Sequence, residues 1–167
     1  MKDGSIVLYV PKRANVIQKA IQFFTGMPQT HAAIYFEGYL YEESMWGAQK
    51  HLYEGSSNEV WEPKIELRNR ERRLMGAFLK RTLGESPPWY RWPYNYLKLL
   101  VLALVYPTRW IWNKLNWVPF QNDLLGEVCS TYVDQAWLIT GRDIIPGMYE
   151  EFTVPGDLSG LPGFERV

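Results

Sequence analysis

The chain has 167 residues but only one cysteine, Cys129, and two histidines, His31 and His51. A single cysteine excludes an internal disulfide framework and a cysteine-based structural zinc site. Neither histidine has carboxylates clustered beside it in a recognisable set of metal ligands, so we expect no metal and no cofactor. Cys129 is therefore either a small buried apolar residue or a reactive thiol.

Long apolar runs are also missing. The longest, residues 99–108, lies between Lys98 and Arg109 and is shorter than the roughly 18 residues that a membrane span needs. Residues 1–5 are not followed by the long apolar segment of a secretory signal, so we expect a cytoplasmic or peripheral-membrane location. Basic and acidic residues both number 18, and this balance gives no basic footprint for nucleic acid.

The composition, with 47% hydrophobic and 22% charged residues, is that of one globular domain over residues 1–167. Residues 86–122 differ from the rest, because they hold no Asp or Glu, four Lys or Arg and five of the eight tryptophans. Aromatic and cationic side chains together suit an anionic membrane interface, so we expect peripheral membrane contact there. Packing into the core and self-association are the alternatives for this insertion.

Hydrophobic spacing predicts an α+β domain with short strands and amphipathic helices. The expected strands cover residues 6–10, 31–36, 39–43 and 60–62. The expected helices cover 16–24, with Asn15 as N-cap, and 68–83 and 126–140. The tail from residue 155 is rich in Gly and Pro and is expected to be irregular.

Three groups in these elements match the needs of thiol chemistry, namely a thiolate, a base and a group that orients the base. Cys129 lies near the start of a helix, and His31 opens a strand whose hairpin partner carries Glu42 and Glu43. We expect a carboxylate to hold Nδ1 of His31 and to leave Nε2 for the thiol. Taken singly, each of these residues is more often structural than catalytic, and His51 is expected to be exposed.

The length of the hairpin turn decides which carboxylate faces His31. A turn made only of Glu37-Gly38 puts Glu42 on the same side of the sheet as His31. A three-residue loop, 37–39, puts Glu43 there instead. The pattern alone leaves both alternatives open.

Four segments, in this order along the chain, resemble motifs of one family. They are Asp3-Gly4-Ser5-Ile6-Val7-Leu8, the stretch from Phe24-Thr25-Gly26 through Thr30-His31-Ala32-Ala33-Ile34, Tyr41-Glu42-Glu43-Ser44, and Val128-Cys129-Ser130-Thr131-Tyr132-Val133. The order resembles the circularly permuted papain-like thiol hydrolases of the NlpC group, in the YiiX-like branch, where the histidine strand precedes the cysteine helix. The resemblance spans most of the chain except residues 86–122.

This resemblance implies a permuted papain-like fold, with a small antiparallel sheet packed against the helix that starts near Cys129. It implies that Cys129 is the nucleophile, His31 the base and Glu43 the orienting residue, because Glu43 directly precedes a small residue. Ser5 and Thr131 depart from the motifs, where Asp and Glu are usual, but neither is one of the three chemical groups.

The implied function is a cysteine hydrolase, an amidase or peptidase that cleaves an amide or ester bond. The implied substrates are a peptide, a peptidoglycan fragment or an acylated lipid. One alternative is a lipid acyltransferase of the lecithin:retinol type. The other is a catalytically inactive adaptor that binds a membrane or a partner.

Overall fold

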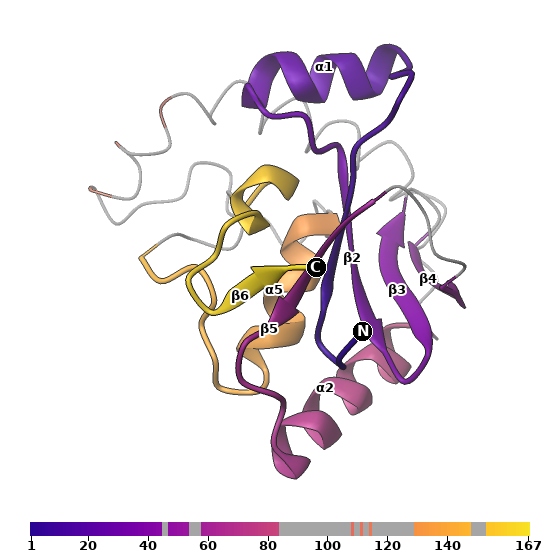
Figure 1. The fold of residues 1–167 in the computed structure, drawn as a ribbon, viewed down its shortest axis with the longest axis vertical. Helices are drawn as coiled ribbons and strands as arrows, with labels where there is room; N and C mark the ends of the chain where they lie inside the picture. Colours follow the sequence, from indigo (N-terminus) through magenta and orange to yellow (C-terminus); the bar gives the residue numbers. More distant parts are fainter. Residues whose placement is uncertain are drawn as a thin grey trace.

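The computed structural model describes residues 1–44, 47–53, 58–83, 108, 111, 114, 129–147 and 153–167. Nearly all of the insertion expected at 86–122 lies outside these ranges, and so does its expected membrane contact. The first three residues of the helix expected over 126–140 also lie outside them. Within the described residues the protein is α+β, with one six-stranded antiparallel sheet and three α-helices (Figure 1).

The strands lie in the order β4-β3-β2-β1-β5-β6, so that β1 is flanked by β2 and β5. Their bounds are β1 Ile6–Tyr9, β2 His31–Phe36, β3 Tyr39–Ser44, β4 Gly47–Leu52, β5 Glu59–Pro63 and β6 Phe164–Arg166. The helices are α1 Val16–Thr25, α2 Asn69–Thr82 and α5 Cys129–Leu138, and a short 3-10 helix, η5, covers Pro155–Leu158.

The strands expected over 6–10, 31–36, 39–43 and 60–62 are confirmed with small shifts in their ends. Strand β4 was not predicted, because most of its residues are exposed and polar and give no alternating pattern. The expectation of an irregular tail is wrong at β6, where three residues pair with β5 at the edge of the sheet.

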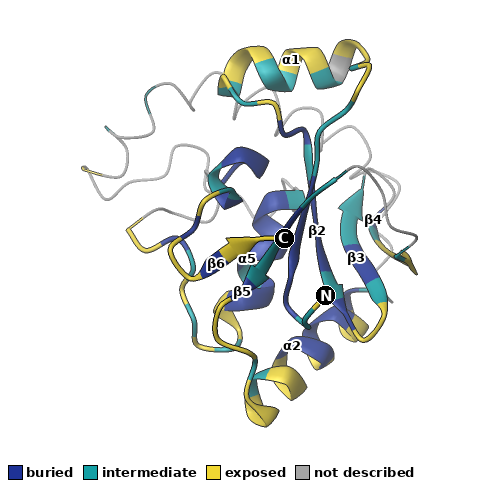
Figure 2. Cartoon of the chain, in the orientation of Figure 1, coloured by how far each residue is buried: buried dark blue, intermediate teal, exposed yellow. Residues whose placement is uncertain are grey.

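The main core lies between one face of the sheet and the helices α2 and α5, which cover that face (Figures 1 and 2). Its largest fully buried side chains include Trp137 and Tyr132 of α5 and Phe36 of β2. The opposite face of the sheet carries a smaller buried cluster of Val7, Ala33, Leu40 and Val60. Tyr9 packs against this second cluster.

The β2–β3 hairpin closes through the two residues Glu37 and Gly38, with φ values of 50° and 87°. Two consecutive positive φ values are typical of the tight turn that matches the twist of a hairpin. The register pairs Ile34 with Tyr41, as the two-residue alternative requires. The hairpin therefore directs His31 and Glu42 to one side of the sheet.

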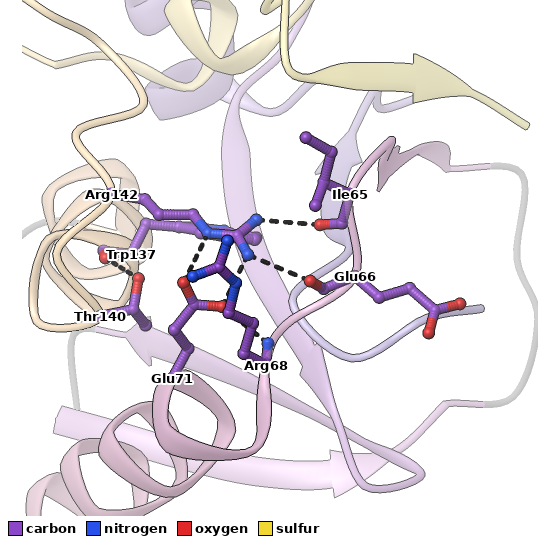
Figure 3. Close-up of polar contacts among 7 residues, drawn as sticks. All are labelled: Ile65, Glu66, Arg68, Glu71, Trp137, Thr140 and Arg142. Carbon is purple, nitrogen blue, oxygen red and sulfur yellow. Dashed lines mark hydrogen bonds and ion pairs between the residues drawn. The ribbon is translucent and has the colours of Figure 1, made fainter.

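Arg142 joins the end of α5 to the start of α2 (Figure 3). Its guanidinium donates to both carboxylate oxygens of Glu71, at 3.1 and 2.6 Å, and to the carbonyl oxygens of Ile65 and Glu66. It also lies over the ring of Trp137, 5.7 Å from the centroid. The hydrogen bonds from Arg142 lower the pKa of Glu71. The two helices that cover the sheet are thus held together by a charged clamp remote from Cys129.

Candidate active site

His31 and Glu42 form a close pair on neighbouring strands. His31 is the first residue of β2, and its Nε2 lies 2.8 Å from Oε2 of Glu42 on β3. Both side chains are mostly covered, with 28% of His31 and 15% of Glu42 exposed. A charge-assisted hydrogen bond in such a site is stronger than one in open solvent, because less water competes for it.

This geometry corrects two expectations. The carboxylate that holds His31 belongs to Glu42, because the two-residue turn puts Glu42 on that side and the neighbouring Glu43 on the other. The ring nitrogen that meets the carboxylate is Nε2, so Nδ1 is the nitrogen left for the thiol. The expected assignment of the two ring nitrogens is therefore reversed.

Cys129 supplies the thiol, at the first residue of α5 in the described chain. Its side chain is half-buried, and the helix packs against β2 and β3, the two strands that carry the pair. The thiol forms a hydrogen bond with the His31 imidazole. It also accepts hydrogen bonds from the backbone N–H groups of Ala32 and Ser130. All three predicted kinds of group are therefore brought together, with Glu42 as the carboxylate.

The electrostatics favour a thiolate–imidazolium pair. Burial raises the pKa of the Cys129 thiol, but the charge of His31, the hydrogen bond from His31 and the two backbone N–H groups together lower it below its usual value. Burial alone would lower the pKa of His31, but the Cys129 thiolate and the Glu42 carboxylate outweigh it and raise this pKa to about 10. Each partner of the pair thus stabilises the charged form of the other.

Tyr9 is a further residue of the site, and sequence reasoning did not identify it. It pairs with His31 across β1 and β2, and the ring centroids lie 5.2 Å apart. Its hydroxyl hydrogen-bonds Glu42, and burial together with that carboxylate raises the pKa of Tyr9. Finding Tyr9 from the sequence would have required knowledge of the β1–β2 register. These two strands are separated in the chain by residues 10–30.

His51 reaches the same carboxylate from β4. Its Nδ1 lies 3.8 Å from Oε1 of Glu42, while 44% of its side chain is exposed, as expected from the sequence. Glu42 therefore has His31 and Tyr9 as hydrogen-bond partners and His51 as a more distant cation when protonated. Together these groups hold the pKa of Glu42 below its usual value against the opposing effect of its burial.

Across the described residues, no group of three or more His, Cys, Asp or Glu side chains is arranged to hold a metal ion. None of the described helices combines the length and the apolarity needed to cross a membrane. The chain matches no protein-family model, and it matches no curated protein. The resemblance to permuted papain-like hydrolases thus remains a prediction that depends on the site and the chain order.

Proposed function

We propose that the protein is a cysteine hydrolase in which Cys129 is the nucleophile, His31 the base and Glu42 the residue that orients the base. One observation carries the proposal: a single imidazole hydrogen-bonds both a half-buried thiol and a carboxylate. A nucleophile, a base and an orienting group within hydrogen-bond reach are the general signature of covalent catalysis.

The order of the elements supports a permuted papain-like fold. The strand that carries His31 precedes the helix that carries Cys129, and that helix packs against β2 and β3 of an antiparallel sheet. Papain-like thiol hydrolases place the cysteine at a helix start beside a histidine on a sheet, and the permuted branch has the histidine first. The fold we propose is therefore the one that the four sequence motifs resemble.

The reaction begins with attack of the Cys129 thiolate on the carbonyl carbon of an amide or ester. As the C–S bond forms, an electron pair moves to the carbonyl oxygen. We expect the backbone N–H of Cys129 to donate one hydrogen bond to this oxyanion. The C–N or C–O bond then breaks, and the His31 imidazolium gives its proton to the leaving amine or alcohol.

Water completes the cycle. Neutral His31 takes a proton from water as the water oxygen attacks the thioester carbon. The C–S bond breaks, the acid leaves, and the thiolate–imidazolium pair is restored. If another nucleophile replaces water in this step, the same site acts as an acyltransferase.

The proposed substrates are acyl groups on a peptide amine, a peptidoglycan peptide or a lipid. All of them present a carbonyl that a thiolate can attack.

The first test is the rate of alkylation by iodoacetamide as a function of pH. Cys129 is the only cysteine, so a single modification reports on it. We expect the apparent pKa of the wild-type thiol to lie below the free value of about 8.5. His31→Ala should raise it, because the imidazolium that stabilises the thiolate is then removed. His51→Ala is the matched control, since His51 contacts Glu42 but not the thiol.

The second test follows acyl transfer from an activated ester, p-nitrophenyl butyrate, by intact-protein mass spectrometry. We expect a butyryl adduct on Cys129 in the wild type and none in Cys129→Ser. A wild-type thiol that titrates near 8.5 and is unaffected by His31→Ala would refute the proposal. The adaptor reading would then become the working hypothesis.

A further inference from the structure

Helix α1 presents apolar side chains to solvent. Val16 is 84% exposed, Phe23 81% and Phe24 37%, and Ala20 is also exposed. These four residues, at positions i, i+4, i+7 and i+8, form one stripe along the helix, which we call the outer stripe. Phe23 and Phe24 contact each other edge to face, with centroids 5.3 Å apart. No described side chain of α1 is buried (Figure 2).

The described side chains on the less exposed side of α1 are mostly polar. Gln18, Gln22 and Thr25 lie there with Ile21. Gln22 donates to the carbonyl oxygen of Pro28, and Thr25 to that of Ile21. The helix thus has the reverse of the usual arrangement, in which the apolar face packs on the protein and the polar face meets water.

Local contacts define both ends of α1. The side chain of Asn15 accepts from the backbone N–H of Gln18, whose own side chain accepts from the N–H of Asn15, both at 2.9 Å. At the other end Gly26, with φ 67°, provides the left-handed C-cap. The outer stripe therefore belongs to a capped helix and not to a frayed segment.

The charges around the outer stripe have one sign. Residues 4–36 include Lys12, Arg13 and Lys19, all exposed, and no Asp or Glu. The flanking carboxylates, Asp3 and Glu37, lie at the opposite end of β1 and β2, where the Asp3 side chain accepts from the Glu37 N–H.

Three carboxylates from other strands, Glu42, Glu43 and Glu59, lie toward the α1 end of the sheet, and none of them is without a partner. Glu42 pairs with His31, and Glu59 lies 3.2 Å from Arg166 and accepts from Gln29. The cations beside the outer stripe therefore have few competing carboxylates. An apolar stripe bordered by cations is the arrangement that binds an anionic bilayer surface.

We propose that α1 is a membrane-docking helix, whose outer stripe enters the interface of an anionic bilayer while Lys12, Arg13 and Lys19 contact the lipid headgroups. Because α1 connects β1 to β2, it lies at the end of the sheet where Tyr9 ends β1 and His31 begins β2 (Figure 1). Docking through α1 would bring the candidate active site close to the bilayer. The docking itself does not require the thiol to be reactive.

The test is co-sedimentation of the full chain with vesicles of phosphatidylcholine alone or mixed with phosphatidylglycerol. We expect binding to the mixed vesicles, loss of binding at high salt, and little binding to phosphatidylcholine alone. Lys12→Glu/Lys19→Glu should weaken partitioning at least about tenfold, because each basic residue near an anionic surface contributes about fivefold. Phe23→Ser should weaken it several-fold, because it removes a ring that would enter the interface.

Matched variants separate local contact from general effects. Arg70→Glu/Arg73→Glu makes the same charge change on exposed positions of α2, at the far end of the molecule (Figure 1). Ile65→Ser removes an apolar side chain that is 70% exposed elsewhere. We expect both variants to bind mixed vesicles like the wild type, and circular dichroism verifies that every variant is folded.

Two results would overturn the proposal. The first is that the wild type does not bind mixed vesicles, or that the α1 variants bind them as well as their matched controls do. Equal binding would place the lipid contact elsewhere in the chain. In the other, sedimentation velocity shows a wild-type oligomer that Phe23→Ser dissociates while vesicle binding is unchanged. The outer stripe would then be a contact between copies of the chain. Normal alkylation of Cys129 in a variant that no longer binds vesicles would show that docking and thiol activation are separate.

Discussion

Tyr9 and His31 face each other across β1 and β2, and Glu42 on β3 hydrogen-bonds both of them. Three neighbouring strands thus each contribute one member of this polar cluster. Because hydrogen-bonded strands hold their side chains more rigidly than loops do, the imidazole is oriented by the sheet itself. Only the thiol is supplied by another element, α5.

Tyr9→Phe tests the hydroxyl while keeping the ring against His31. A hydrogen bond to a charged group contributes about 1.5–3 kcal/mol, so we expect the free energy of unfolding at neutral pH to fall by about 1–2 kcal/mol. Urea unfolding measures it. The control Tyr35→Phe removes a hydroxyl from the same face of the sheet and should change the value by less than about 0.5 kcal/mol. Equal losses in the two variants would argue against a specific role for Tyr9.

Glu42→Gln should weaken thiol activation more than Glu43→Gln. Without the Glu42 charge the imidazolium is less stable, so the pKa of His31 falls and the pKa of the Cys129 thiol rises. At pH values below the thiol pKa, a rise of one pKa unit lowers the thiolate fraction, and so the alkylation rate, about tenfold. Alkylation across a pH series measures this change. A larger loss in Glu43→Gln would instead favour the residue that the family resemblance implies.

The two groups of the Cys129–His31 pair make contributions to stability that depend on pH in opposite directions. Because the fold raises the pKa of His31, the protonated imidazole stabilises the fold. This contribution is complete at pH values below the pKa of the unfolded chain, about 6.5, and is lost as pH rises toward about 10. The lowered pKa of Cys129 stabilises the fold fully above about 8.5, and this contribution is lost as pH falls toward the folded value.

Above about pH 8.5 the Cys129 contribution is complete, and only the His31 contribution still changes. Stability should therefore fall as pH rises from about 8.5 toward about 10. The measurement is the free energy of unfolding of the wild type, minus that of His31→Ala/Cys129→Ala, from acid to alkaline pH. A difference that rises steadily with pH would show that the thiolate forms without the imidazolium.

Arg142→Ala should destabilise the fold without changing thiol reactivity. It removes the paired hydrogen bonds to Glu71 and those to two carbonyl oxygens, and we expect the melting temperature to fall by about 3–6 °C. The pKa of Glu71 is lowered in the fold, so this stabilisation exists above the unfolded value of about 4.3 and fades below it. The difference between variant and wild type should shrink in acid. Arg70→Ala, on the exposed side of α2, should leave the melting temperature unchanged.

Much of the architecture could be predicted because its signals are local. Short, nearly continuous apolar runs mark β1 and β2, and Asn15 and Gly26 mark the two ends of α1. Turn geometry alone limits the carboxylate that faces His31 to Glu42 or Glu43. The choice between them depended on the positive φ of Glu37, which is uncommon for a residue with a side chain and leaves no clear mark in the sequence.

The remaining features depend on contacts between distant parts of the chain. Tyr9 lies beside His31 only because of the β1–β2 register. Strand β6 forms by pairing with β5, which lies about a hundred residues earlier in the chain. Arg142 likewise finds Glu71 across the packed helices. Periodicity within a short window carries no information on such pairings.

The position of Cys129 late in the chain has a consequence for biosynthesis. By the time the ribosome has added β5, the growing polypeptide already holds Tyr9, His31 and Glu42, but Cys129, the proposed nucleophile, has not yet been made. The proposed base and its carboxylate are thus synthesised while no thiol exists to be alkylated or oxidised. Translation that stops before α5 would release a fragment without Cys129, so no truncated product of this kind can carry out the proposed thiol chemistry.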